Sequence, residues 1–133
     1  MVQVKYDLLY DGTTSPRSGT WGIGEWEKFS IASEDDCYKL GIGKRVKIQN
    51  MGSHDPFKYH NEMNFTTTDR DNNDWDDKRD SRNCAVEFGG GWWYKNCFNA
   101  CLNCQRTGKS IWEHEYGNWQ ILSHSYMWIK QVA

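Results

Sequence analysis

The chain has 133 residues with 16 basic and 18 acidic side chains, a length that favours one domain. Its formal net charge of −2, with both signs interspersed, provides no field that would steer it onto nucleic acid. Hydrophobic residues make up only 38%, yet 8 Trp, 7 Tyr and 5 Phe are present, so we expect a small aromatic core. No apolar run approaches the roughly 18 residues of a membrane span.

The first part of the chain carries strand patterns. Between Val2 and Tyr10 apolar residues recur with a period of two, which predicts a half-buried strand. Residues 11–20 are rich in Ser, Thr, Gly and Pro and are expected to form a turn and a surface loop. Short strands are predicted at 26–31 and 38–42, and the acidic turn 33–36 between them indicates a hairpin.

After Lys44 the regular patterns fade, and the chain becomes polar, aromatic and rich in turn residues. We expect one short helix around 56–61, with Pro56 in its first turn. A second half with so little regular structure needs disulfides or a bound metal to hold it in order.

Five cysteines are many for a cytosolic domain of this size but ordinary for an extracellular one, so we place the chain outside the cell. They are Cys37, Cys84, Cys97, Cys101 and Cys104. An odd number leaves at least one thiol that is free, pairs with another chain, or lacks its partner. The spacing from Cys101 to Cys104 suits a redox pair, a zinc pair or a bridge, and a bridge is favoured because no second pair of this kind occurs.

Residues 69–77 place oxygen-bearing side chains at alternate positions, as a loop does when it wraps a calcium ion. The alternative is an acidic, solvated loop. An EF-hand is excluded, because no Gly occupies the sixth position and no Glu the twelfth. Nearby, Asn64 begins a sequon for N-glycosylation.

Between Cys84 and Cys97, residues 88–94 contain a glycine turn followed directly by three aromatic residues. We expect at least one of its two tryptophans to lie in the core. No nucleophile lies beside a base, and the glycines lack the lysine of a phosphate loop, so we expect no enzyme. His60 lies in a polar turn and is interpreted as a hydrogen-bonding structural residue rather than a general base.

Five motifs follow one another in the second half, namely 59–67 (YHNEMNFTT), 69–72 (DRDN), 83–86 (NCAV), 90–94 (GGWWY) with Cys97, and 102–103 (LN). Together they resemble the fibrinogen C-terminal domain family, which includes ficolins, tachylectins, angiopoietins and tenascins. The resemblance implies an α+β fold with a central twisted antiparallel sheet, few short helices, and a loop-rich subdomain that carries calcium and a ligand pocket.

The resemblance also implies a domain organisation. Residues 1–133 would form a single fibrinogen-like domain, with the central sheet in 1–50 and the loop-rich part in 51–133. The N-terminal subdomain of the family has no counterpart, so we expect either a fragment or a shortened member.

The resemblance assigns two features of the family, a disulfide and a calcium site, to residues of this chain by their position. The family disulfide falls on Cys84 and Cys97. Calcium is the expected cofactor, and its ligands fall on Asp71, Asn73, Asp74, Trp75 and Asp77. Of these, the tryptophan and the last aspartate would contribute main-chain carbonyls. The asparagine replaces a carboxylate of relatives, which should lower the calcium affinity without forbidding binding.

The third implied site is a pocket beside the second cysteine, where lectin-like relatives bind the acetyl group of a sugar. A cis peptide between Cys97 and Phe98 would present its N–H to the acetyl oxygen. The residues expected at the pocket are Phe88, Tyr94, Cys97, Phe98, Trp112, Tyr116, Asn118 and Trp119. Phe98 replaces a histidine of relatives, Asn118 replaces a tyrosine, and the loop before Trp112 is short, so a changed ligand is expected.

Two functions remain open from the sequence. The first is a secreted, calcium-assisted, lectin-like recognition protein of innate-defence type that binds glycans or acetylated groups. The second is an extracellular protein-interaction or assembly module that binds a peptide or a receptor. An oligomer is expected in both cases, and an interchain disulfide through Cys37, Cys101 or Cys104 is one arrangement.

Overall fold

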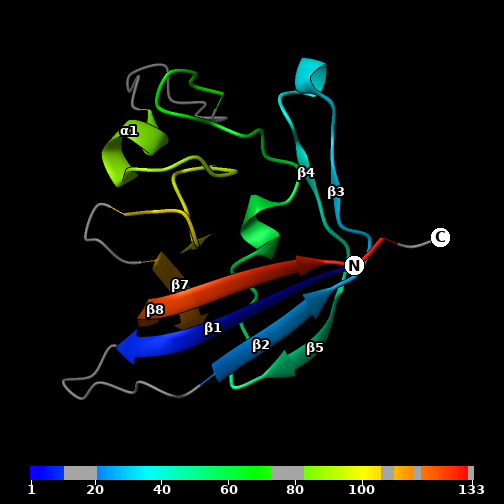
Figure 1. Cartoon of the computed structure of the whole chain (residues 1–133), viewed down its shortest axis with the longest axis vertical. Coiled ribbons are helices and arrows are strands. Elements are labelled where there is room, and N and C mark those ends of the chain that lie inside the picture. Colours follow the sequence, from blue (N-terminus) through cyan, green and yellow to red (C-terminus); the bar gives the residue numbers. More distant parts are fainter. Residues whose placement is uncertain (11–20, 73–82, 106–109, 116–117, 132–133) are drawn as a thin grey trace.

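A computed structural model describes residues 1–10, 21–72, 83–105, 110–115 and 118–131. Its centre is a six-stranded sheet in the order β5-β2-β1-β8-β7-β6, in which neighbouring strands are antiparallel (Figure 1). The expected central antiparallel sheet is therefore confirmed. Its strands are β1 (Val2–Tyr10), β2 (Trp21–Trp26), β5 (Arg45–Gln49), β6 (Ala100–Cys101), β7 (Ser110–Glu115) and β8 (Asn118–Ile129).

The alternation of side chains in β1 explains its place inside the sheet. Val2, Val4 and Tyr6 are fully buried, and the residues between them lie on the other face. The strand predicted at Val2–Tyr10 is confirmed. Tyr6 packs over Gly22 of β2, where a Cβ atom would lie 2.6 Å from the tyrosine ring, so this close approach requires glycine.

The strand predicted at 26–31 is wrong in its bounds. β2 stops short of Lys28, whose left-handed φ of 57° interrupts the extended backbone. The predicted hairpin is confirmed in a shorter form, because β3 (Ser30–Ile31) pairs with β4 (Leu40–Gly41). The acidic turn between them forms the 3-10 helix η1 (Glu34–Asp36).

The sheet takes in more of the chain than expected. Although periodic patterns fade after Lys44, β5 forms there, and β6, β7 and β8 all lie after residue 99. β8 has 12 residues and is inserted between β1 and β7. The last strands complete the sheet, so a division at residue 50 does not match it, and the loop-rich part of the described chain comprises residues 50–72 and 83–99.

The described residues of the loop-rich part form two short helices. η2 (Lys58–His60) falls within the helix predicted at 56–61 and confirms it in a shorter form. α1 (Cys84–Phe88) was not predicted, because five residues are too few to show a helical period. Asn83 caps its start, accepting hydrogen bonds from the N–H groups of the second and third helical residues at 2.8 and 3.3 Å. Gly89, with a φ of 86°, ends it.

An aromatic core joins the inner face of the sheet to the loop-rich part. Trp26 of β2 packs edge-on against Phe57 with ring centres 5.2 Å apart, and Phe57 lies 6.1 Å from Trp92. Trp92 and Trp93 are both buried, so the expected core tryptophan is confirmed. Aromatic pairs of this kind contribute about 0.5 to 1.5 kcal/mol each beyond the area they bury.

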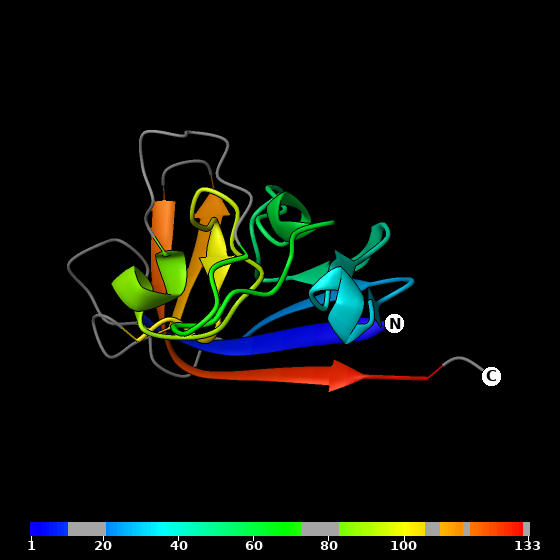
Figure 2. The same ribbon diagram turned by 90° about the horizontal axis from the view of Figure 1, so that it is seen from above.

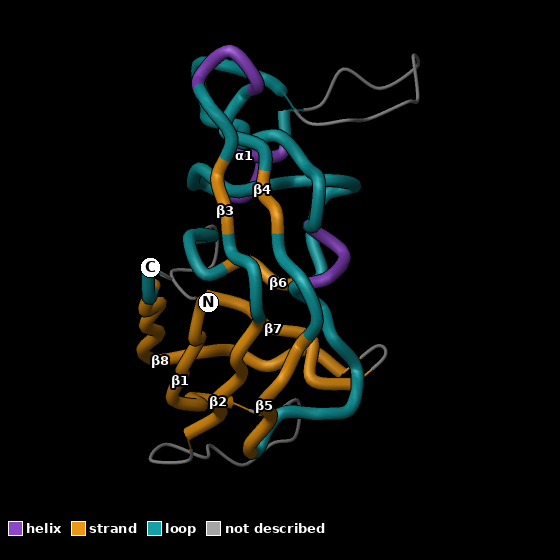
Figure 3. The backbone as a smooth tube through the Cα atoms, turned by 90° about the vertical axis from the view of Figure 1, so that its right-hand side faces the viewer, coloured by secondary structure: helices purple, strands orange, loops and turns teal. Residues whose placement is uncertain are grey.

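The figures show how the parts are arranged. In Figure 3 the strands of the central sheet gather at one end of the molecule, and the loop-rich part with β3 and β4 lies at the other. In Figure 2 the second half of β8 runs beside β1, and the described helices and loops all lie on one side of these two strands. Within the described ranges, no helix is long and apolar enough to cross a membrane.

Candidate functional site

The disulfide that the resemblance implies is present. Cys84 and Cys97 are bonded, and their Cα atoms are 5.7 Å apart. The bond ties the first residue of α1 to the turn that precedes Phe98. Because it cross-links positions 13 residues apart, the segment from α1 to Phe98 is held at both ends.

Three aromatic rings from separate elements meet beside this disulfide, and they are termed the aromatic patch. Phe88 ends α1, Phe98 follows the second cysteine, and Trp119 lies in β8. The ring centres of Phe88 and Phe98 are 4.7 Å apart, and those of Phe98 and Trp119 are 5.8 Å apart, both in edge-to-face geometry. Trp119 is 37% exposed and both phenylalanines are half-buried, so solvent reaches this surface.

Two of the expected pocket residues belong to the core instead. Tyr94 is fully buried, its hydroxyl donates to the carbonyl of Gly90, and burial raises its pKa to about 12. Trp112 is 1% exposed and packs its ring 5.6 Å from that of Tyr6. The prediction that these two side chains contact a ligand is therefore wrong, because both point into the protein.

The backbone at the second cysteine also differs from the expectation. The peptide bond between Cys97 and Phe98 is trans, so the predicted cis bond is wrong, and trans is the form that a non-proline peptide favours by about 2.5 to 4 kcal/mol. The carbonyl of Cys97 accepts a hydrogen bond from the N–H of Lys95 at 2.9 Å. Of the other expected pocket residues, Tyr116 lies outside the described part, and Asn118 is described only as the first backbone position of β8.

The cysteine pairings left open by the sequence resolve into a second bridge and a free thiol. Cys101 and Cys104 are bonded and buried, which confirms the favoured bridge. Cys37 is free and partly exposed. The second bridge lies close to the aromatic patch. Gln105 follows Cys104 in the chain, and its N–H donates to the carbonyl of Phe88 at 2.9 Å.

His60 is the hydrogen-bonding structural residue that the sequence predicts. It is fully buried, and its Nδ1–H donates to the carbonyl of Trp93 at 2.7 Å. Its Nε2 accepts hydrogen bonds from the N–H groups of Asn99 and Ala100 at 3.1 and 3.2 Å. Burial lowers the pKa of the ring to about 4, so it is neutral at pH 7. The ring thereby fixes the backbone that follows Phe98.

The described part of the expected calcium loop consists of its two ends. Asp71 is exposed at the first end, and Asn73, Asp74, Trp75 and Asp77 all lie outside the described residues. The residues that are described include no group of three or more His, Cys, Asp or Glu that could hold a metal. The donor chemistry fits calcium, because carboxylate, amide and carbonyl oxygens are the ligands it prefers.

Two asparagines hold both ends of that loop on one backbone segment. The Nδ2 of Asn72 donates to the carbonyl of Phe65 at 2.9 Å, and its N–H donates to Oγ1 of Thr66 at 3.0 Å. At the other end, the Nδ2 of Asn83 donates to the carbonyl of Thr67 at 2.9 Å. No pattern in the sequence indicates the first anchor, whereas an asparagine before a short helix is a capping signal that indicates the second.

The glycosylation sequon lies next to this anchoring segment. Asn64 is partly exposed, whereas Thr66, the hydroxyl residue of the sequon, is fully buried. Glycosylation of Asn64 stays a prediction.

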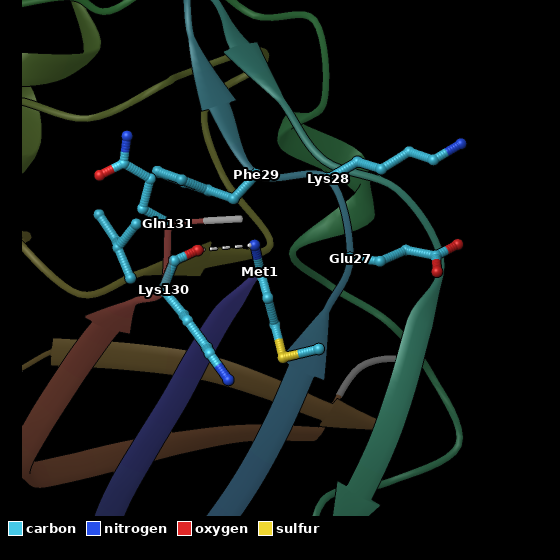
Figure 4. A pocket seen from close by; sticks show the side chains of 7 residues that line it. Met1, Glu27, Lys28, Phe29, Lys130 and Gln131 are labelled. Atoms are coloured by element: carbon cyan, nitrogen blue, oxygen red, sulfur yellow. Dashed lines mark hydrogen bonds between the residues drawn. The ribbon is translucent and has the colours of Figure 1, made fainter. Parts of the chain in front are cut away.

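A separate surface hollow of about 760 Å³ lies where β1 and β8 meet at their ends (Figure 4). The N-terminal amine of Met1 donates to the carbonyl of Lys130 at 3.3 Å, and the N–H of Lys130 donates to the carbonyl of Met1 at 2.9 Å. The β1–β8 pairing therefore extends one residue beyond each strand. Glu27, Lys28 and Phe29 form another part of the wall. No residue predicted as a site lies in this hollow.

Comparison with known proteins places these features in a family. The chain matches the family described as fibrinogen beta and gamma chains, C-terminal globular domain, over residues 16–132. It is 39% identical over 118 residues to tenascin-R of Gallus gallus, covering 88% of this chain and 8% of that protein. It is 31% identical over 109 residues to the fibrinogen beta chain of Bos taurus, covering 74% of this chain and 22% of that protein.

A solved structure agrees with the sequence matches. The fibrinogen-like globe domain of human ANGPTL2 superposes with a TM-score of 0.69 at 26% identity, over 95% of this chain and 55% of that one. The chain thus spans a minor part of the curated relatives and just over half of the solved domain. The expected fibrinogen-like fold is confirmed, and because the family match covers most of the sequence, this chain belongs to the family of fibrinogen C-terminal globular domains.

Proposed function

We propose that this domain is an extracellular protein-interaction module whose aromatic patch binds an apolar group of a peptide or protein partner. The observation that carries the proposal is the contact of Phe88, Phe98 and Trp119 at a surface that solvent reaches. Aromatic side chains are enriched at the energetic centres of protein interfaces, because a ring with few rotatable bonds buries a large area.

The extracellular setting is supported by the chemistry of the chain. Two disulfides close within 133 residues, and such bonds persist in oxidising compartments. Fibrinogen and tenascin-R, which this chain resembles, are extracellular proteins, and fibrinogen-like domains are binding modules without enzymatic activity.

The supports around the patch favour binding without rearrangement. The Cys84–Cys97 disulfide holds the two ends of the segment that carries both phenylalanines. The carbonyl of Phe88 is hydrogen-bonded from Gln105, and His60 fixes the residues after Phe98. A surface that is already ordered loses little conformational entropy when a partner binds, so more of the contact energy remains as affinity.

A lectin-like function is the second candidate, and the same patch supports it. Partly exposed rings can stack on the apolar face of a sugar as well as on a peptide side chain. Calcium, when bound, would neutralise the carboxylates of its loop and order them. In this reading Asp71 and the other predicted ligands hold the ion, and the Asn72 and Asn83 anchors set where the loop begins and ends.

A binding screen separates the two functions. The folded domain is tested against a displayed random peptide library and a glycan array, beside Phe98→Ala and the matched control Val86→Ala. Val86 lies in α1 and is 63% exposed, outside the patch. Peptide binding that Phe98→Ala abolishes and Val86→Ala keeps supports the interaction module. Glycan binding with the same dependence would favour the lectin, and binding that ignores both substitutions would contradict a role for the patch.

A further inference from the structure

The face of the sheet that points away from the core carries aromatic side chains of its own. Alternate residues of β1 are buried in the core, so the residues between them point to the opposite face. Register partners in an antiparallel pair share a face, and here Gln3 lies opposite Trp128 while Lys5 lies opposite Tyr126. Trp21 of β2 lies opposite the next outward residue of β1. These three aromatic side chains therefore belong to the outer face.

The three rings follow one another, and they are termed the outer row. The ring centres of Tyr126 and Trp128 are 5.4 Å apart with planes 14° apart, and those of Trp21 and Tyr126 are 5.9 Å apart with planes 34° apart. Because the planes are close to parallel, the rings turn their faces in similar directions. Tyr126 and Trp128 are 46% and 49% exposed, and Trp21 is partly exposed. Exposed apolar groups that are contiguous mark an interaction site, whereas scattered ones do not.

Hydrogen-bonding side chains lie beside the outer row on the same face. The Nε2 of Gln3 donates to Oε1 of Glu25 at 2.6 Å, and the Nζ of Lys47 lies 3.7 Å from the same oxygen. The Nζ of Lys5 lies 4.5 Å from the centre of one ring of the row. Glu25 and Lys47 offset each other, so these neighbours supply donors and acceptors without a strong field of either sign.

The area of the outer row decides which kind of partner it fits. A Tyr or Trp side chain buries about 150 to 250 Å² when it is enclosed, so a half-exposed ring offers on the order of 100 Å². The three rings together offer about 300 Å², whereas a stable protein interface takes about 800 Å² from each partner. The row is therefore too small to hold a protein, but it is large enough for a slender ligand that lies along it.

We propose that the outer row binds a chain of neutral sugars, with successive units stacked on successive rings. A pyranose ring has an apolar face of C–H groups and a rim of hydroxyl groups, so it stacks on an aromatic face while its hydroxyls meet polar neighbours. A lone sugar unit would cover only one ring, and a chain covers the row. Neutral sugars are assigned because the polar border is nearly balanced in charge.

This site is separate from the aromatic patch and does not depend on the function proposed for it. The two sites share no residue. Sugar binding at the outer row requires neither an acetyl group nor calcium, because stacking and hydrogen bonds from side chains supply the contacts.

Isothermal titration calorimetry of the 133-residue chain tests the proposal. The probes are cellohexaose, laminarihexaose, mannohexaose and xylohexaose, which are uncharged and free of acetyl groups. At least one should bind, with a Kd unchanged by chelator and at least tenfold lower than that of its disaccharide, because a longer chain reaches more rings. Removing a ring from the centre of a binding site typically costs tenfold or more in affinity, so Trp128→Thr and Tyr126→Thr should each raise the Kd at least tenfold.

The variants are chosen to keep the sheet intact. Threonine has a high β propensity, so it removes the ring and suits the strand. The matched control is Tyr38→Ala, because Tyr38 is an aromatic residue outside the row that is 43% exposed, and it should leave the Kd within about twofold. Circular dichroism checks that each variant is folded. Should a threonine variant not fold, NMR of the native domain decides, since the bound sugar should shift the indole N–H signals of Trp21 and Trp128.

The contrary results are equally specific. Failure of all four hexasaccharides to bind would overturn the proposal, and so would binding that survives both threonine substitutions in folded form. Binding that Phe98→Ala abolishes and Trp128→Thr keeps would place the sugar on the aromatic patch instead. Self-association that Trp128→Thr removes, in place of sugar binding, would make the outer row a protein contact and contradict the argument from its area.

Discussion

His60 makes the folding stability depend on pH over a window set by its burial. The ring has a pKa of about 4 in the folded protein and an ordinary value of about 6.5 in an unfolded chain. Between these values the unfolded chain binds a proton that the folded protein does not. The stabilisation is therefore complete above about pH 6.5 and is lost as the pH falls toward 4. The difference between the two pKa values corresponds to about 3 kcal/mol.

The hydrogen bonds of His60 explain why protonation destabilises the fold. Its Nε2 accepts from the N–H groups of Asn99 and Ala100, and a protonated nitrogen cannot accept. Burial disfavours the charged ring most, and the nearby positive charge of Lys95 adds to this, whereas the carbonyl of Trp93 favours the proton. Two backbone N–H groups would lose their acceptor in a fully buried site, which is costly.

Urea denaturation from pH 4 to pH 8 measures this effect. The comparison is with His60→Gln, whose amide oxygen can accept a hydrogen bond but does not titrate. Between pH 6.5 and 4, the native protein should lose about 3 kcal/mol more of its free energy of unfolding than the variant does. Subtracting the variant removes the contributions of the carboxylates and the other histidines. Parallel pH profiles for the two proteins would refute the assignment of His60 as a buried neutral acceptor.

Three other outcomes are expected from the cysteines and the acidic loop. Millimolar calcium should raise the Tm, because only the folded state brings the ligands together, and Asp71→Asn should reduce this rise. A Tm that changes neither with calcium nor with a chelator would contradict the predicted metal site. Replacing Cys101 and Cys104 by serine should lower the free energy of unfolding, measured by urea denaturation, by about 1.5 to 2 kcal/mol. The loss is small because the bridge closes a loop of only 3 positions. An unchanged denaturation midpoint would contradict this prediction. A slower band on non-reducing gels should disappear with Cys37→Ser, and its absence from the native protein would exclude the interchain disulfide.

The fold was predictable where a local pattern carries the information. β1 shows a clean period of two because one of its faces is buried, and the sequence predicts it at Val2–Tyr10. α1 has five residues, and its order comes from the Asn83 cap and the disulfide rather than from a helical period. β8 was missed because its second half exposes Tyr126 and Trp128, so apolar residues lie on both faces and no alternation is visible.

The candidate site was predictable only in part. The resemblance indicated the Cys84–Cys97 disulfide and the three rings of the aromatic patch, because these residues carry over by position from the family. It could not indicate that Trp112 faces inward, since that depends on its strand pairing with β6 and on the packing against Tyr6. The trans peptide after Cys97 is a backbone conformation that residue identity alone does not specify.

The most direct test of the proposed function is the affinity of a library-selected peptide for three proteins, measured by isothermal titration calorimetry. They are the native domain, Phe98→Ala and Val86→Ala. Removing a ring at the centre of an interface typically costs more than about 1.4 kcal/mol, so Phe98→Ala should raise the Kd at least tenfold. Val86→Ala should leave it within about twofold, because Val86 does not belong to the patch. Equal affinity for the native domain and for a folded Phe98→Ala would contradict binding at the aromatic patch.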